Sequence, residues 1–346
     1  MKHFTQRLIA CAAAAALLTS AASALDLSLD NYKEVAEEHS TTILANNQLN
    51  EGAKEDKRNM KVVQVGADGS TTVSDGYTYS GTAIYQLRMQ DKQNESDNAS
   101  VPYSLGSSLI TYYSLQLQYA DLESQERTLQ SNIDLMEKKV ELGMAKQLDL
   151  IELQNSMVQL QNGKIALKNS LDMLVSNIAI SVGTTVEELN ILPMDPYTAE
   201  EEATLKADLE AMYDWNSAYK NNWNLELMRM SGGLMGNKQY QGLLTQIETF
   251  EETLKQLYDS AYADMLNKYD AYVIAKQVYQ KKADDFVITQ VKHQQGMISD
   301  VDYLAAEVQF AADQRAIDNA VLDLYKAEMK MEAYNNGVML QETAGA

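Results

Sequence analysis

Two matching turns, 153 residues apart, limit most strongly what this chain can fold into. Gly143 and Gly296 are each followed by methionine, and the same offset pairs Asp149 with Asp302. The pattern Gly-Met, three residues, then apolar-Asp-apolar therefore occurs twice. Because glycine readily adopts the left-handed conformation that ends a helix, each turn predicts a place where one helix stops and the next returns.

The segments around each turn have the pattern of long helices. Apolar residues recur three, four or seven positions apart over 104–182 and again over 243–335. Only three prolines interrupt the chain, at 102, 193 and 196. The prediction is a mainly α fold of two repeated helical hairpins, 104–182 within a first repeat (25–192) and 243–335 within a second (208–340). Residues 193–207 form an acidic linker or the start of a helix between the repeats.

The residues after each turn also fit a returning helix. Ser299 stands at the expected N-cap with Asp302 three residues later, and Asp149 and Asp302 both fall in a first helical turn. A hydroxyl there caps a free N–H group, and a carboxylate interacts favourably with the helix dipole. We predict capping roles for Asp149, Ser299 and Asp302.

A different pattern interrupts the first repeat near 61–89. Val62, Val63 and Val65 precede a turn around Gly69, and aromatic and apolar residues then alternate with polar ones from Tyr77 to Met89. A period of two residues with a glycine turn predicts a small β-hairpin insertion. The polar stretch 91–100, closed by a proline, predicts a loop.

The first 24 residues have the features of a signal peptide. Lys2 and Arg7 precede an apolar run over 8–18, and Ala22-Ser23-Ala24 is a small-x-small cleavage site. A lipoprotein signal ending at Cys11 is the less favoured alternative, because the run before it is short. Cys11 is the only cysteine, so the mature chain would have no disulfide and no thiolate chemistry. The protein is therefore predicted to be exported.

Composition and motifs argue against several classes of function. The net charge of −21 disfavours nucleic acid and anionic lipid as partners. The three histidines, His3, His39 and His293, are not spaced as a metal site. Phosphate-binding loops and nucleophile elbows are missing from the sequence, and the acidic run 200–202 is interpreted as solvated linker. We predict no enzymatic activity, no metal and no cofactor.

The duplicated turn resembles the signature at the periplasmic tips of the TolC family of outer-membrane channels. Leu27-Ser28-Leu29 resembles the opening Leu-x-Leu helix of that family, and Asn222 to Leu225 lies where its second repeat has Asn-x-x-Leu. The resemblance covers almost all of the chain after the signal peptide. It implies a TolC-like α-barrel protomer that forms a homotrimer, a passive export duct in a tripartite efflux pump or a type I secretion system.

The resemblance also implies partners and a location. The tips would contact a periplasmic adaptor, or membrane fusion protein, linked to an inner-membrane transporter, with the duct in the outer membrane and periplasm. The positions expected to face the adaptor are Leu142, Gly143, Met144, Gln295, Gly296 and Met297. The resemblance adds a place at the lumen entrance as a second role for Asp149, Ser299 and Asp302. Asp302 falls where some members carry an aspartate ring, but the accompanying arginine and second aspartate are Ile298 and Ala305 here.

One departure from the family keeps a second function open. Residues 231–240 of the second repeat are too few for two membrane-crossing strands, so any membrane β-barrel would be reduced or missing. The alternative function is therefore a structural or scaffolding coiled-coil protein of the cell envelope without a channel.

Overall fold

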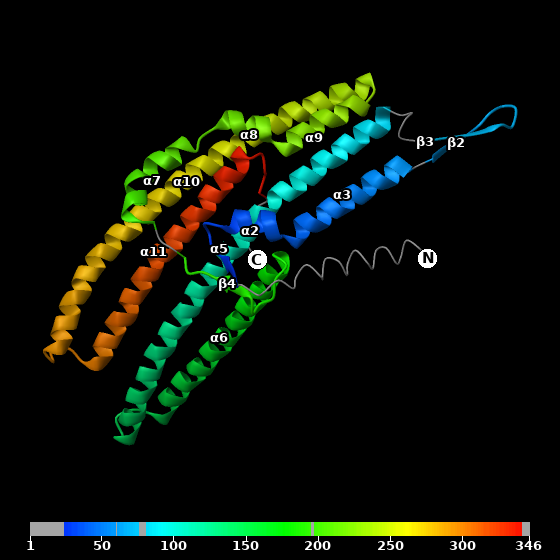
Figure 1. Cartoon of the computed structure of the whole chain (residues 1–346). Helices are drawn as coiled ribbons and strands as arrows, with labels where there is room; N and C mark the ends of the chain where they lie inside the picture. The colour runs from blue at the N-terminus through cyan, green and yellow to red at the C-terminus, as the bar shows by residue number, and fades with distance from the viewer. Residues whose placement is uncertain (1–23, 60, 76–80, 195–196, 341–346) are drawn as a thin grey trace.

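The protein is an elongated assembly of helices (Figure 1). The computed structural model describes residues 24–59, 61–75, 81–194 and 197–340, so the signal peptide predicted for 1–24 lies outside the described residues except for Ala24. Four long helices dominate: α5 (Gly81–Glu141), α6 (Gln147–Ser181), α10 (Asn237–Gln294) and α11 (Asp300–Asn335). They form the two helical hairpins that the repeat predicts, which confirms the fold class. Both glycine turns lie toward the same end of the molecule.

The two hairpins lie side by side, with α5 and α11 in the middle. Helix α5 packs on α6, α10 packs on α11, and α5 also packs along α11. The lateral order is therefore α6, α5, α11, α10, as Figure 1 shows, and α6 and α10 form the two outer edges. A hydrophobic core runs through the part of the molecule away from the turns, where both repeats contribute buried side chains.

Polar and close contacts fix the alignment of α5 against α11. Asn336 donates a hydrogen bond of 2.7 Å to the hydroxyl of Tyr103. Arg315 pairs with Asp121 nearer to the turns. Between these two pairs α5 has a glycine, Gly106, where an added Cβ would collide with a methionine sulfur of α11. The two helices run antiparallel in a single register over this length.

Each repeat opens with a short helix, a buried capping residue and a second helix. In the first repeat α2 (Tyr32–His39) is followed by Ser40 and α3 (Thr41–Asn59), and in the second α8 (Trp215–Asn221) is followed by Asn222 and α9 (Trp223–Ser231). Ser40 accepts a hydrogen bond from the Ile43 N–H at 3.3 Å, and Asn222 accepts one from the Leu225 N–H at 2.9 Å. A buried N-cap satisfies donors that would otherwise be unpaired. The kinks at Ser40 and Asn222 are thus equivalent in the two repeats.

The repeats differ in length on one side of this kink. Ser40 precedes Gly143 by 103 residues, whereas Asn222 precedes Gly296 by 74. The additional 29 residues lie in an arm made of α3, the start of α5, and a hairpin of β2 (Lys61–Val65) and β3 (Thr71–Asp75). In the second repeat the corresponding connection is the short helix η1 (Gly232–Leu234) before α10. The hairpin projects from the end of the molecule opposite the turns (Figure 1).

The segment Leu27-Ser28-Leu29 resembles the opening helix of the TolC family, but the first helix of this chain begins only at Tyr32. Residues 25–27 form strand β1 (Leu25–Leu27), which pairs in parallel with β4 (Leu189–Ile191). Leu27 is fully buried in this pairing. The two strands attach the beginning of the first repeat to its end, a long-range contact that a local sequence pattern does not reveal.

The predicted strand over 77–89 is wrong where the structure describes it. The hairpin of β2 and β3 ends at Asp75, and residues 81–89 belong to α5. The loop predicted for 91–100 is also helical, and α5 continues through Pro102. Residues 77–80 lie outside the described residues, so that part of the prediction is not addressed.

Side-chain hydrogen bonds hold this helical segment against α3. Asn94 and Asn98 each donate to the side-chain oxygen of Asn47 on α3, at 2.9 and 2.8 Å, and Asn50 donates to Asp91 at 2.8 Å. Asp91, Asn94 and Asn98 recur at spacings of three and four, so they share one face of α5. A polar seam, rather than an apolar one, therefore holds the arm together.

The linker between the repeats is largely a helix. After residues 195–196, which lie outside the described residues, α7 (Ala199–Ala211) begins with a capping box between Thr198 and Glu201. Leu205 and Leu209 are buried in the core that α10 shares. Glu202 is not simply solvated, because it contacts Lys276 and the hydroxyl of Tyr272 on α10. The solvated-linker interpretation of 200–202 is corrected accordingly.

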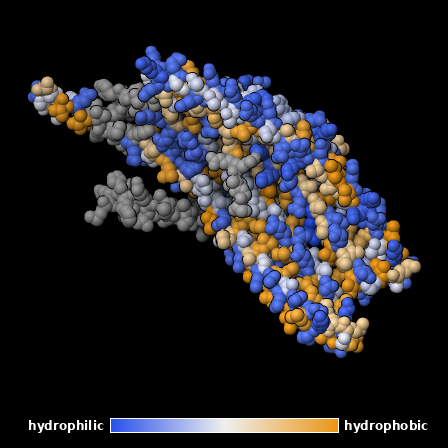
Figure 2. All heavy atoms as spheres, turned by 180° about the vertical axis from the view of Figure 1, so that it is seen from behind, coloured by the Kyte–Doolittle hydropathy of each residue, from blue (hydrophilic) through white to orange (hydrophobic). Residues whose placement is uncertain are grey.

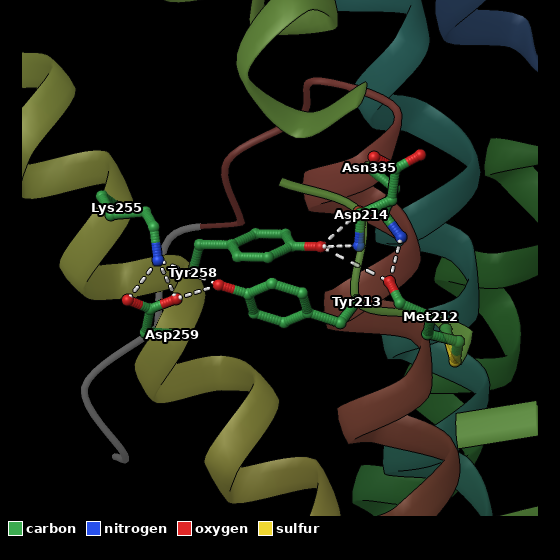
Figure 3. Close-up of polar contacts among 7 residues, drawn as sticks. All are labelled: Met212, Tyr213, Asp214, Lys255, Tyr258, Asp259 and Asn335. Atoms are coloured by element: carbon green, nitrogen blue, oxygen red, sulfur yellow. Dashed lines mark hydrogen bonds and ion pairs between the residues drawn. The ribbon is translucent and has the colours of Figure 1, made fainter. Parts of the chain in front are cut away.

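A buried tyrosine of α10 joins three parts of the second repeat, as Figure 3 shows. The Tyr258 hydroxyl accepts from the Asp214 N–H at 2.7 Å and donates to the Asn335 side chain at 2.8 Å. The Asn335 amide in turn donates to the Met212 carbonyl at 2.8 Å. Beside it, Tyr213 donates to Asp259 at 2.8 Å on the exposed side. The connection between α7 and α8 is thereby attached to α10 and α11.

The surface of the two helical hairpins carries many apolar side chains. Figure 2 shows apolar patches between hydrophilic ones down this part of the molecule. Within the described residues, none of the helices combines the length and apolar character needed to span a bilayer.

Candidate functional site: the two hairpin tips

The first tip is a glycine turn closed by backbone hydrogen bonds. Gly143 has φ of 68°, and its N–H donates to the Val140 carbonyl at 3.0 Å. The next N–H, of Met144, reaches back to the Lys139 carbonyl at 2.7 Å. This pair of bonds is a Schellman motif, which satisfies carbonyl groups at the end of α5. Glycine is needed because other residues adopt positive φ at a cost.

The second tip has the same backbone conformation and the same pair of hydrogen bonds. Gly296 has φ of 69°, its N–H donates to the His293 carbonyl at 2.9 Å, and the Met297 N–H donates to the Lys292 carbonyl at 2.8 Å. Nothing lies within 4 Å of a Cβ added at Gly143 or Gly296. Both glycines are therefore required by backbone conformation and not by close packing.

Apolar side chains at the tips are left uncovered. Leu142, Met144 and Met297 are 72%, 73% and 69% exposed. In a Schellman motif the residue after the glycine commonly packs on an apolar residue of the last helical turn. Here the position three residues from the end of each helix is a lysine, Lys139 or Lys292, and both methionines remain largely exposed. The first tip thus exposes two neighbouring apolar side chains, Leu142 and Met144, and the second exposes Met297. Apolar side chains exposed at a fixed turn suit a protein-contact surface.

The two returning helices differ in how their first turn is capped. Ser299 accepts a hydrogen bond from the Asp302 N–H at 3.1 Å and donates to the Asp302 carboxylate at 2.7 Å. In the first repeat Lys146 occupies the N-cap without a side-chain bond, while Asp149 lies in the first turn of α6. The geometry of Ser299 and Asp302 is that of a helix cap. The second tip is therefore capped by side chains and the first by backbone alone.

His293 adds a further contact to the second tip. Its Nε2 lies 2.8 Å from the Asp300 carboxylate, and its ring stacks on Tyr303 with centroids 4.2 Å apart and planes 8° apart. The pairing with Asp300 across the turn joins α10 directly to the start of α11.

The packing beneath the tips differs in chemistry at equivalent positions. In the second hairpin Phe286 stacks on Phe310 at 4.5 Å and lies near Tyr303 at 6.0 Å. The offset of 153 maps Phe286, Tyr303 and Phe310 onto Ile133, Leu150 and Met157, which form the buried cluster of the first hairpin. The second hairpin is thus aromatic where the first is aliphatic. Aligning the repeats in sequence would have shown this difference.

The part of the chain that the structure describes contains no cluster of side chains suited to a metal ion. His39, weighed for metal binding in the sequence, is exposed, and its Nε2 lies 3.8 Å from a carboxylate oxygen of Glu38. Within residues 24–340, leaving aside the short stretches that are not described, groups of three or more histidine, cysteine or acidic residues suited to a metal ion are not found. The tips therefore remain the main candidate site.

Three solved structures to which this chain is similar are outer-membrane proteins. The outer-membrane channel OprN matches over 89% of this chain and 90% of its own, with 13% identical residues and a TM-score of 0.52. VceC of Vibrio cholerae, an outer membrane protein, matches over 90% and 97% with 14% identity and a TM-score of 0.42. The CmeC outer membrane channel of Campylobacter jejuni matches over 91% and 87% with 12% identity and a TM-score of 0.47.

No protein-family model matches the sequence, and no curated protein matches it. The match to OprN shows that this chain has the fold of an outer-membrane channel. It confirms the TolC-like fold that the duplicated turns predict.

Proposed function

We propose that this protein is the duct component of an export apparatus, an efflux pump or a type I secretion system. Copies of the chain, three by the resemblance to the TolC family, close into a cylinder through which cargo passes. The cylinder is passive, and a transporter in another membrane supplies the energy. The protein acts in the cell envelope, at the outer membrane and periplasm, after export by its signal peptide.

The exposed tips carry this proposal. Apolar side chains are stabilised by burial. Leu142, Met144 and Met297 nevertheless remain exposed, on two turns of matching geometry. Apolar groups held at fixed places by rigid turns suit docking of a protein partner. The expected partner is the periplasmic adaptor, contacted through Leu142, Gly143, Met144, Gln295, Gly296 and Met297.

Tip glycines provide a test of docking. Gly143→Val and Gly296→Val force a β-branched residue into positive φ, at about 1–2 kcal/mol of local strain. Gly163→Val is the matched control, because Gly163 is exposed within α6 with nothing within 4 Å of an added Cβ and no positive φ. Cells expressing the tip variants should retain more of a fluorescent efflux dye, while circular dichroism of the purified chains stays unchanged. Dye export equal to that of the control would refute docking through the tips.

Conductance separates the duct from the scaffold. The assembled protein in a planar bilayer should pass current, with a preference for cations because the chain carries a net charge of −21. An envelope scaffold with the same helices would give no current. The absence of conductance from oligomeric protein would therefore favour the scaffolding function.

A further inference from the structure

Each tip holds a methionine directly after the turn glycine, and its thioether is open to reagents in solution. Met144 and Met297 are 73% and 69% exposed, the two most exposed methionines of the described chain. Their N–H groups take part in closing the turns, at 2.7 and 2.8 Å, so the backbone holds both side chains at fixed places. Oxidants convert the thioether of methionine to a polar sulfoxide.

Both repeats retain this methionine although most of the tip sequence differs between them. With the offset of 153, residues 139–149 and 292–302 agree only in a lysine, the glycine, the methionine and an aspartate. The glycine is required by its positive φ, and the aspartate lies in the first turn of the returning helix. An exposed methionine has no such backbone role. Compared with leucine, it adds flexibility and a sulfur atom that can be oxidised.

The methionines of the core are shielded from solvent. Met265 and Met331 are fully buried, and Met157 and Met329 are 7% exposed. Oxidation of a buried methionine places a polar oxygen in apolar surroundings and disrupts the core, whereas oxidation at an exposed turn leaves the core packed. An oxidant can therefore modify the tips of this chain while the fold stays intact.

Thioethers are the sulfur groups that the mature chain would carry. Cys11 is the only cysteine, and it lies within the predicted signal peptide. Without a thiol, reversible oxidation of sulfur in this protein takes place at methionine. The most accessible of these sulfur atoms lie on the same surface as the proposed adaptor contact.

We propose that Met144 and Met297 are modification sites, at which oxidation to the sulfoxide by hypochlorous acid blocks docking of the partner. This inference rests on the function proposed above and adds a regulation of the same surface. In each reaction the sulfur loses two electrons and gains the oxygen, chlorine is reduced to chloride, and a proton is released. Methionine sulfoxide reductases reverse the change: two thiols become a disulfide and the oxygen leaves as water.

A sulfoxide weakens docking because its oxygen is strongly hydrated. Burying that oxygen against an apolar partner removes its water without supplying a hydrogen-bond donor. Every chain of the cylinder contributes two tips, so a small loss at each tip is repeated around the ring. Contacts that act together in this way lose combined affinity steeply when each is weakened.

The first test follows the modification itself in the purified mature chain. Limiting hypochlorous acid is added, and the sulfoxide at each methionine is measured by mass spectrometry of peptides. Met144 and Met297 should be oxidised at least several-fold faster than the buried Met265 and the 39% exposed Met235, while circular dichroism stays unchanged. Rates at the tips no higher than at Met265, or unfolding that accompanies oxidation of the tips, would overturn the inference.

The second test compares dye export after and before a pulse of hypochlorous acid, as a ratio within each strain. Export should fall several-fold in wild type, whereas the double variant Met144→Leu with Met297→Leu should keep the export it had before the pulse. Met235→Leu is the matched control, separated from the second tip by the whole length of α10, and should lose export as wild type does. The adaptor and the transporter meet the same oxidant in every strain. An equal fall in wild type and the double variant would therefore overturn the inference.

A third test needs no oxidant and separates this inference from docking. Met144→Gln with Met297→Gln gives each tip a polar acceptor of similar length and should lower dye export several-fold, while Met235→Gln should not. Full export in the glutamine variant, where Gly143→Val and Gly296→Val lose it, would refute regulation by oxidation and leave docking in place. Full export in the glycine variants as well would refute docking through the tips, and this inference with it.

Discussion

The hydroxyl of Tyr197 donates a hydrogen bond of 2.7 Å to the carboxyl of Glu328, joining the segment between the repeats to α11. The Tyr197 ring also stacks on Tyr325, with centroids 5.0 Å apart. Burial raises the pKa of Glu328 to about 7, and the nearby charge of Glu332 acts in the same direction. A carboxyl near the junction of the two repeats therefore titrates near neutral pH.

Replacing Glu328 should flatten the dependence of stability on pH. The pKa is 4.5 in the unfolded reference and about 7 in the folded chain, so the folded state binds this proton more tightly. The resulting stabilisation is complete below the unfolded pKa and is lost as the pH rises through the folded one. At 1.36 kcal/mol per pKa unit the loss amounts to about 3 kcal/mol.

The measurement is the apparent melting temperature at pH 5 and pH 8. Glu328→Gln should be more stable than wild type at pH 8 and should lose this part of the pH dependence. Glu252→Gln, an exposed carboxylate on α10, is the control and should retain it. A pH dependence identical in wild type and Glu328→Gln would show that Glu328 ionises normally in the folded protein.

The helix caps of the two tips differ, so adding a hydroxyl at the first and removing one at the second should have opposite effects on helix stability. Lys146→Ser places a hydroxyl at the N-cap of α6, with Asp149 three residues later as Asp302 follows Ser299. It should stabilise the first turn of α6 by about 1 kcal/mol, and Ser299→Ala should destabilise the first turn of α11 by a similar amount. Hydrogen exchange at residues 147–150 and 300–303 reports both changes. Unchanged exchange in Ser299→Ala would mean that the hydroxyl contributes nothing as a cap.

Exchanging His293 for its counterpart in the first repeat should loosen the second tip. His293→Val installs the residue found at 140 and removes both the contact with Asp300 and the stack on Tyr303. Amides of 294–302 should exchange faster, while global melting changes little because the pair is near the surface. Val140→His, which lacks an aspartate at 147, is the control and should not slow exchange in the first tip. Equal hydrogen exchange in wild type and His293→Val would show that the contacts of His293 do not stabilise the second tip.

In the tyrosine network of Figure 3, replacing the buried tyrosine should lower the free energy of unfolding more than replacing the exposed one. Tyr258→Phe leaves the Asp214 N–H and the Asn335 side chain without their partner in a buried site, which should cost about 1–3 kcal/mol. Tyr213→Phe removes hydrogen bonds from a residue that is 41% exposed and should cost less than about 1 kcal/mol. Comparable losses in urea denaturation would show that burial does not set the value of these bonds.

The sequence was informative where apolar spacing and turn chemistry agree. The glycine turns at 143 and 296 predicted both hairpins because positive φ and helix periodicity are local properties. The arm was missed because Asn94 and Asn98 bind Asn47 through amides, and a search for apolar periodicity does not register such a seam. The alternation through 81–89 was then interpreted as a strand.

Tertiary contacts account for the other differences. The pairing of β1 with β4 joins residues 164 positions apart, and three residues carry too little pattern to predict a strand. The Schellman geometry of the tips followed from glycine, whereas the bond between His293 and Asp300 depends on how two helices are oriented across the turn. The aromatic cluster at the second tip was detectable, since the offset of 153 sets Phe286 against Ile133.

The 29 additional residues between the buried cap and the turn in the first repeat have a consequence for any closed assembly. At the end that carries Gly143 and Gly296, every chain contributes two turns of matching backbone geometry, so the backbone of n chains approaches 2n-fold rotational symmetry there. At the opposite end one repeat projects a strand hairpin and the other a short 3₁₀ turn. That rim has only n-fold symmetry, so a binding partner arriving there can distinguish the repeats.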